Sequence, residues 1–281
     1  MHTQIMRGLL LAATAGGLWA AGTAVASAAD TTGIEGVGSG SQAVVDIQAP
    51  LTIAGNAIGG GDATTSDAGI SQAVAPSVAV DTTSGVDGVL SGTQAIVSVA
   101  VPVTVSGNAV SVLGDAESTG ATTESAAPAA PASTATTSGD EGVLSGTQAP
   151  VSVAAPVVVA GNAVSVLGDA ESTDATTASS AGDASGSGAS TSGDDGVASG
   201  TQVPVDVVAP VTAGGNAVSV LGDAWSEGSS VESSAAAGSG SGASTSGDDG
   251  VVSGTQVPVG VVAPVTAGGN AVSVLGDAWS E

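Results

Sequence analysis

The chain contains no cysteine, lysine, tyrosine or phenylalanine, and His2 and Arg7 are its only basic side chains. Nucleophilic catalysis by cysteine or lysine is therefore excluded, and serine has no lysine to activate it. Zinc or haem sites built from thiolates or several imidazoles are excluded as well. Nucleic-acid binding needs cationic side chains against the phosphates, and these are missing. The composition thus argues against an enzyme and against a nucleic-acid partner.

The first 29 residues are typical of a secretory signal peptide. A short basic segment with His2 and Arg7 precedes an apolar run, and residues 26–28 are small, as at a cleavage site. Removal of this segment leaves 26 Asp and Glu and no basic side chain, hence a formal charge of −26. We therefore expect a secreted chain with no transmembrane segment after processing and no cofactor.

Exported domains without a large core usually rely on disulfides for stability. This chain has none to offer, and aromatic residues make up only 1% of it, so valine, alanine and leucine must do the packing. Stability must then come from the stacking of repeats or from association between chains.

One phrase of 25 residues occurs five times, most clearly from Gly200 to Ala224. Each copy holds one Gly-Asn pair, and these pairs contain every asparagine of the chain. The asparagines lie 52, 54, 54 and 54 residues apart, at Asn56, Asn108, Asn162, Asn216 and Asn270. Such a fixed period indicates that one structural unit has been copied.

The copies and the segments between them define the expected organisation of the chain. After the signal peptide at 1–29, the repeats occupy residues 36–63, 88–116, 142–170, 196–227 and 250–281. The intervening linkers are 64–87, which includes a degenerate half-repeat, and then 117–141, 171–195 and 228–249. Because the linkers consist mainly of Ser, Gly, Ala, Thr, Asp and Glu, we expect them to be flexible.

Within a repeat, valine alternates with smaller or more polar residues. Such alternation predicts a strand with one apolar face. The Gly-Asn pair that follows can adopt positive φ and reverse the chain, and Val110 and Val112 then supply a short return strand. We therefore predict an all-β fold of five β-hairpins, joined by flexible acidic linkers, with the five asparagines at the turns.

A lone two-stranded hairpin is marginal in water, so the valine face must find a partner. The hairpins can stack within one chain and remain monomeric, or they can associate between chains, as uncharged β-prone segments do in cross-β assemblies. Both alternatives use the same candidate assembly face, which comprises Val97, Val99, Val101, Val103, Val105, Val203, Val205, Val207, Val257, Val259 and Val261.

Acidic residues flank the repeats. Pairs precede three of them, at 140–141, 194–195 and 248–249, and single aspartates follow four of them, at Asp115, Asp169, Asp223 and Asp277. Carboxylates suit Ca²⁺, so the alternative function is a soluble extracellular acidic protein that binds Ca²⁺ or a surface partner without assembling. The spacing matches neither the twelve-residue calcium loop nor the calcium-binding nonapeptide, and we assign no metal site.

Paired carboxylates can also hydrolyse glycosides, but only when a rigid scaffold fixes their separation. Here they lie in predicted linkers without an aromatic platform for sugars. Trp225 and Trp279, at equivalent places in the last two copies, are interpreted as packing or interface anchors. We assign no catalytic residue.

The fourth copy resembles the repeat of the chaplin family. Chaplins are secreted hydrophobic proteins of filamentous actinobacteria. The resemblance is carried, in order, by Gln202-Val203-Pro204-Val205, by Gly215-Asn216 and by Val218-Ser219-Val220-Leu221-Gly222. The resemblance also covers the second, third and fifth copies, over residues 94–114, 148–168 and 256–276. The family's first cysteine falls at Ala54, Ser106, Ala160, Gly214 and Gly268, so the chain is similar to a cysteine-less, multi-repeat variant.

The resemblance implies a structural protein of the cell surface. Chaplins coat aerial hyphae and spores, form amyloid-like fibrils at air–water interfaces, and aid attachment to surfaces. The expected partners are further copies of the chain or other chaplin-like proteins, at the cell wall or at an air–water interface. Association with the wall is expected to be non-covalent.

Overall fold

The computed structural model describes residues 23–25, 31–33, 35–66, 69–74, 82–127, 135–182, 189–236 and 243–281. These residues form β-strands, turns and irregular segments, with no α-helix among them. Accordingly, no helix that could cross a membrane is found in this part of the chain.

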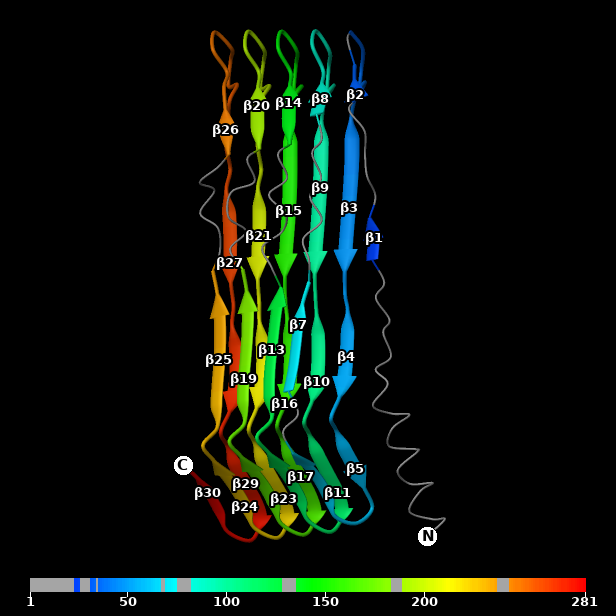
Figure 1. Cartoon of the computed structure of the whole chain (residues 1–281). Coiled ribbons are helices and arrows are strands. Elements are labelled where there is room, and N and C mark those ends of the chain that lie inside the picture. Colours follow the sequence, from blue (N-terminus) through cyan, green and yellow to red (C-terminus); the bar gives the residue numbers. More distant parts are fainter. Residues whose placement is uncertain are drawn as a thin grey trace, which may run out of the picture.

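The five repeats form five coils of a β-solenoid that lie side by side (Figure 1). Each strand pairs in parallel with the strand at the same place in the next coil. Gln42 is thus in register with Gln94, and Gln94 with Gln148. The spacing of the asparagines is therefore the length of a coil, and each copy stacks on the previous one.

Three parallel sheets form what we call the descending layer, which runs from the upper loops to the lower turns in Figure 1. The first contains β3 (Gln42–Gln48), β9 (Gln94–Ala100), β15 (Gln148–Ala154), β21 (Val205–Val208) and β27 (Val259–Val262). The second contains β4 (Leu51–Ala54), β10 (Val103–Ser106), β16 (Val157–Ala160), β22 (Val211–Gly214) and β28 (Val265–Gly268). The third contains β5 (Ala57–Gly59), β11 (Ala109–Leu113), β17 (Ala163–Leu167), β23 (Ala217–Leu221) and β29 (Ala271–Leu275).

Three further sheets form the return layer, which leads back to the upper loops. Its lower sheet contains β6 (Ala63–Ser66), β12 (Ala116–Thr119), β18 (Ala170–Thr173), β24 (Ala224–Glu227) and β30 (Ala278–Ser280). Its middle sheet contains β7 (Gly69–Ala73), β13 (Thr122–Ala127), β19 (Thr176–Ala181) and β25 (Ser230–Ala235). Its upper sheet contains β2 (Thr31–Thr32), β8 (Thr82–Ser84), β14 (Thr136–Ser138), β20 (Ser190–Ser192) and β26 (Ser244–Thr245).

The all-β fold and the repeated unit are as predicted, but the hairpin is wrong. β10 and β11, on the two sides of one Gly-Asn pair, belong to different sheets and do not pair with each other. Gly107 has φ 63°, yet the chain only bends there. The amide of Ala109 donates to Asn162 O in the next coil at 2.8 Å. Because neighbouring coils use the backbone hydrogen bonds, no local reversal forms.

The prediction of flexible linkers also needs correction. The ranges 117–141, 171–195 and 228–249 supply most strands of the return layer, although residues 128–134, 183–188 and 237–242 lie outside the described part. The described part of the degenerate half-repeat, residues 70–74, does not start another coil, and its residues 75–80 lie outside the described part. Its Gln72, in β7, accepts a hydrogen bond from Thr104 Oγ1 instead of stacking on the glutamines of the repeats.

Most of the predicted signal peptide lies outside the described residues. Its residues 23–25 form β1 (Thr23–Val25), which pairs antiparallel along the outer edge of β3. This pairing is the one antiparallel ladder among the described strands.

The core between the layers is made mainly of small and polar side chains, with a few larger apolar ones such as Val158 and Val208. Gln94, Thr104 and Ser106 are fully buried, whereas the valines between them point outward. Further down, a cluster of alanines joins the layers, comprising Ala63, Ala109, Ala116, Ala163, Ala170, Ala217 and Ala224. Such small side chains allow the two layers to lie close together there.

Many buried hydroxyls in this core are hydrogen-bonded, while a few, such as Thr177 Oγ1 and Thr212 Oγ1, have no partner among the described residues. Ser118 Oγ donates to Gly107 O at 2.7 Å, and Ser172 Oγ and Ser226 Oγ repeat this contact with Gly161 and Gly215. Such satisfied hydroxyls each contribute about 1 kcal/mol, whereas an unpaired one would destabilise the fold. The serines and threonines between the valines therefore line the core.

Candidate functional site

The outward side of the descending layer is entirely apolar. The outward positions of β3 and β4, and of their counterparts in the other coils, hold only alanine, valine, leucine or isoleucine. These positions are the odd-numbered residues of 43–53, 95–105, 149–159, 203–213 and 257–267, which together we call the valine face. On the outermost coils the side chains are well exposed, as for Ile47 (49%) and Val261 (46%).

All eleven valines predicted as an assembly face lie on the valine face. Val97, Val205 and Val259, which are far apart in sequence, stand in one row with Val45 and Val151. The rest of the face, which includes all of its residues in the first and third repeats and also Val211 and Val265, is missing from the predicted set. Valine alternates in the same way in the first and third repeats, for example at Val151 and Val153. This alternation could have identified their residues of the face.

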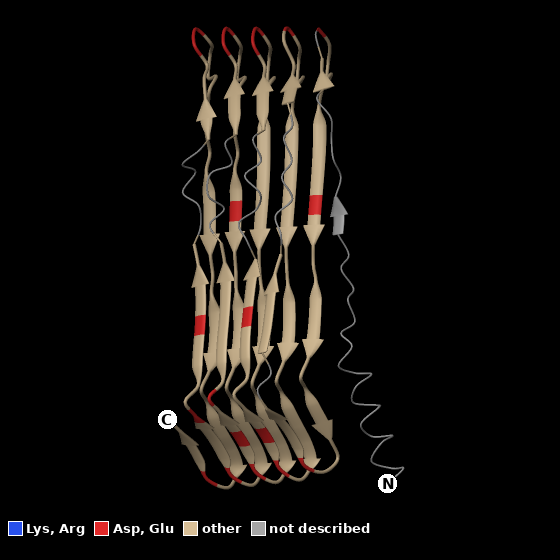
Figure 2. Ribbon diagram, in the orientation of Figure 1, with Lys and Arg blue, Asp and Glu red and all other residues tan. Residues whose placement is uncertain are grey.

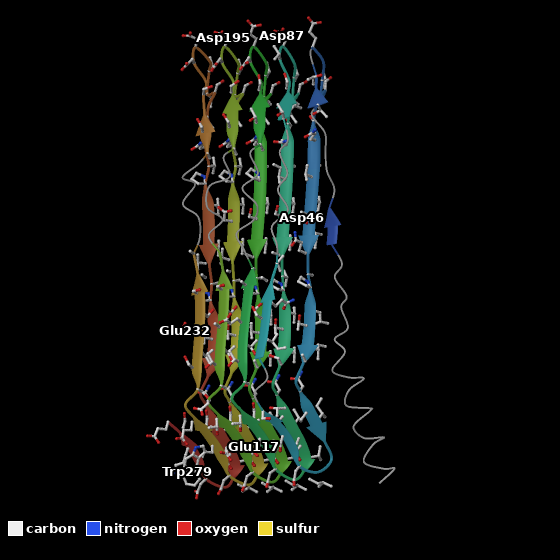
Figure 3. All side chains as sticks on the ribbon, viewed as in Figure 1. Asp46, Asp87, Glu117, Asp195, Glu232 and Trp279 are labelled. Carbon is white, nitrogen blue, oxygen red and sulfur yellow. The ribbon has the colours of Figure 1, made fainter. Side chains whose placement is uncertain are left out.

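The outward side of the return layer is polar. Glu117 and Glu171 are exposed on β12 and β18, and hydroxyl-bearing residues occupy many of the other outward positions. Trp225 and Trp279 continue the same row, with their ring centroids 5.7 Å apart. The rings therefore pack on each other, as an anchor role predicts (Trp279 is labelled in Figure 3). The solenoid is thus an amphipathic slab with one apolar and one polar side.

The five asparagines lie at the bends after β4, β10, β16, β22 and β28, and they also form a ladder. Asn108 Nδ2 donates to Asn56 Oδ1 at 2.7 Å, and Asn162 Nδ2 donates to Asn108 Oδ1 at 2.8 Å. Asn216 and Asn270 continue the series at 2.7 and 2.8 Å. Each rung fixes the register of one coil on the previous one, which goes beyond the predicted turn role.

A second ladder of amides was missed by the sequence analysis. Gln148 Nε2 donates to Gln94 Oε1 at 3.1 Å, and Gln202 Nε2 donates to Gln148 Oε1 at 3.1 Å. These side chains are almost completely buried. The sequence did contain a signal for this ladder. Each 25-residue phrase has one glutamine near its start, and these glutamines have the same spacing as the asparagines.

Carboxylates gather mainly at the upper loops and the lower turns (Figure 2). One row runs through the upper loops and comprises Glu35, Asp87, Glu141, Asp195 and Asp249, each with positive φ. At the lower turns, Asp115 Oδ1 accepts the amide of Asp169 at 3.0 Å, and Asp169 Oδ1 accepts that of Asp223 at 2.8 Å. The described residues contain no group of three or more acidic or imidazole side chains placed to hold a metal ion.

Stacking brings like charges close together in the upper row. A hydrogen bond with Asp87 raises the pKa of Glu141 above its ordinary value of 4.5. The charge of Asp87, slight desolvation and the charges of Asp195 and Asp140 raise this pKa further. Glu141 therefore keeps its proton to a higher pH in the folded protein than in the unfolded chain.

This pKa shift predicts a pH-dependent stability. Because the folded state binds the Glu141 proton more tightly, the free energy of unfolding should decrease as the pH rises from 4.5 through the raised pKa. Asp87→Asn should reduce this decrease, since it removes the charge beside Glu141. Thermal unfolding between pH 4.5 and 7.5 tests both statements. An Asp87→Asn protein with the same pH dependence as the native chain would contradict them.

No family model, curated protein or solved structure matches this chain. Its interpretation therefore depends on the geometry of the molecule. That geometry consists of a broad apolar face, a polar face behind it, and rows of carboxylates at both ends of the coils.

Proposed function

We propose that the chain is a secreted structural protein of the cell surface. Its valine face covers apolar surfaces or meets air, and its return layer and carboxylates face water. In this way it coats a cell, hypha or spore, changes the hydrophobicity of that surface and aids attachment, as the resemblance to chaplins implies. Retention at the wall is non-covalent, and further copies or other chaplin-like proteins are the partners.

The wholly apolar composition of the valine face is the observation that supports this proposal. Ten residue steps of about 3.3 Å along the strands and five coils about 4.8 Å apart give a face of roughly 800 Å². The largest apolar patch of an ordinary soluble monomer is about 300–600 Å². Larger patches are typical of surfaces that meet a partner or an interface.

The strand arrangement also favours amyloid-like properties. The coils stack as parallel, in-register strands with amide ladders, which are the features of a cross-β arrangement. Within one molecule, however, each strand comes from a different repeat of the same chain. Self-association through the valine faces would leave this pattern unchanged.

The proposal predicts strong activity at an air–water interface. The variant Val99→Thr/Val153→Thr/Val207→Thr places three hydroxyls in one row of the valine face while keeping β-branched side chains. It should need about tenfold or more protein to lower surface tension equally, because apolar area is lost. Tensiometry, with contact angles of coated glass, measures this effect.

The matched control adds hydroxyls to the polar side. Ala126→Thr/Ala178→Thr changes outward residues of β13 and β19, so it should leave surface activity unchanged. Native protein that fails to lower surface tension, or a valine-face variant that equals the native chain, would overturn the proposed function.

A further inference from the structure

We propose that two copies of this chain pair through their valine faces in solution and form a closed dimer. The inference rests on the proposed function, because it uses the same face. It goes beyond that function by naming a second copy of the chain as the partner. This copy covers the valine face in solution, before the protein reaches air or an apolar surface.

The size of the valine face fits a second copy. Roughly 800 Å² for each copy is the area that a standard, stable protein–protein interface buries on each partner. Obligate homodimer interfaces are also more apolar than other interfaces. With no polar side chain at any outward position of 43–53 and its counterparts, the face offers nothing to a hydrogen-bonding or charged partner. Its best complement is another apolar sheet.

The distribution of charge directs pairing to the valine face. Acidic side chains occupy the upper loops, the lower turns and the return layer, as the labelled Asp87, Asp195, Glu117 and Glu232 illustrate (Figure 3). The formal charge of the chain is −25, so contacts between these surfaces are repulsive. Of the two broad sides of the described solenoid, the valine face alone carries no acidic side chain. An interface that uses the same face on both copies is closed and does not propagate.

The relief of the face gives the pairing a definite register. One row across the sheet forms a shallow trough because four of its five residues are alanine: Ala49, Val101, Ala155, Ala209 and Ala263. The adjacent row, two residues further along each strand, forms a ridge of Leu51, Val103, Val157, Val211 and Val265. A two-fold axis that runs between these rows, along the stacking direction, places the ridge of each copy over the trough of the other.

The test fills the trough without making it polar. Ala155→Leu/Ala209→Leu keeps the face apolar but removes the space for the partner's ridge, which should weaken pairing about tenfold or more. The same substitutions on the return layer, Ala126→Leu/Ala178→Leu, serve as the control. Analytical ultracentrifugation should show a dimer for the native chain and for the control, and a monomer for the trough variant at the same concentration. Circular dichroism checks that all three proteins are folded.

Small-angle X-ray scattering tests the geometry. A face-to-face pair is about twice as thick as the monomer and no longer along the stacking direction, whereas end-to-end stacking doubles the length. A monomeric native chain, a trough variant that still forms dimers, doubled length or open-ended growth would each overturn the pairing. If the native chain is monomeric but lowers surface tension, the pairing alone fails. If it forms dimers but has no surface activity, the proposed function alone fails.

Discussion

Replacement of Asn108 by aspartate should lower the free energy of unfolding by about 3–5 kcal/mol at pH 7. Asn108 is 8% exposed, and its Nδ2 lies 2.7 Å from Asn56 Oδ1, 3.0 Å from Ser106 O and 3.0 Å from Val159 O. A carboxylate would put a charged oxygen opposite these three acceptors. It would both remove the donor and add repulsion where solvent is largely excluded.

The same substitution at the end of the ladder is the matched control. Asn270 is exposed, so water can solvate a carboxylate there, and Asn270→Asp should cost less than about 1 kcal/mol. Denaturant unfolding followed by circular dichroism compares the two variants. As the pH falls from 7 toward about 4, the carboxyl group introduced by Asn108→Asp takes up a proton and regains one donor, so the deficit of this variant relative to the native chain should shrink. Equal effects at the two positions would show that the ladder does not hold the coils in register.

Much of the unit could be predicted from the sequence. The alternation from Val97 to Val105 gave the strands and their two sides correctly, because the period of a strand is local and does not depend on its partner. The Gly-Asn pair correctly marked a change of direction. The partner of each strand was not predicted. It lies 52 to 54 residues away, and a local turn signal cannot distinguish a reversal from a bend.

The buried side of the strands was also not evident from the pattern. Hydrophobicity alone assigns valine to the inside and Ser, Thr and Gln to the outside. Here the inward positions of a thin, two-layer coil hold mostly Ala, Ser, Thr and Gln, and buried hydroxyls such as Ser118 Oγ bond to backbone carbonyls. Most valines of the descending layer are therefore left outside. The valines predicted as an assembly face thus lie outside, and the polar side of the strands is buried instead.

The predicted linkers failed for a related reason. Segments rich in Ser, Thr and Ala bury too little apolar surface to fold alone, so composition predicts flexibility. In a stack, however, each such segment lies beside a similar one that offers a complete ladder, as β13 and β19 do from Thr122↔Thr176 to Ala127↔Ala181. Prolines are also accepted inside the stack. Pro102 separates β9 from β10, and its carbonyl still accepts the amide of Val157.

A methyl group at Gly168 should separate two coils, so Gly168→Ala is expected to cost about 3–5 kcal/mol. Gly168 has φ 148°, which favours glycine, and an added Cβ would overlap the carbonyl group of Gly114 in the previous coil. That carbonyl also accepts a hydrogen bond from Ser165 Oγ at 2.8 Å, so it cannot move without a further loss. The collision is with backbone, and no rotamer change relieves it.

Gly60→Ala is the control for this prediction, because a Cβ at Gly60 has no atom within 4 Å. It lies near the same lower turn in the first coil and should change stability by less than about 1 kcal/mol. Denaturant midpoints measure both variants, and tensiometry shows whether a disturbed stack still presents its apolar face. If Gly168→Ala proves as stable as Gly60→Ala, the coils do not approach as closely as the fold requires. If instead it loses stability and surface activity together, the valine face depends on the regular stacking of coils.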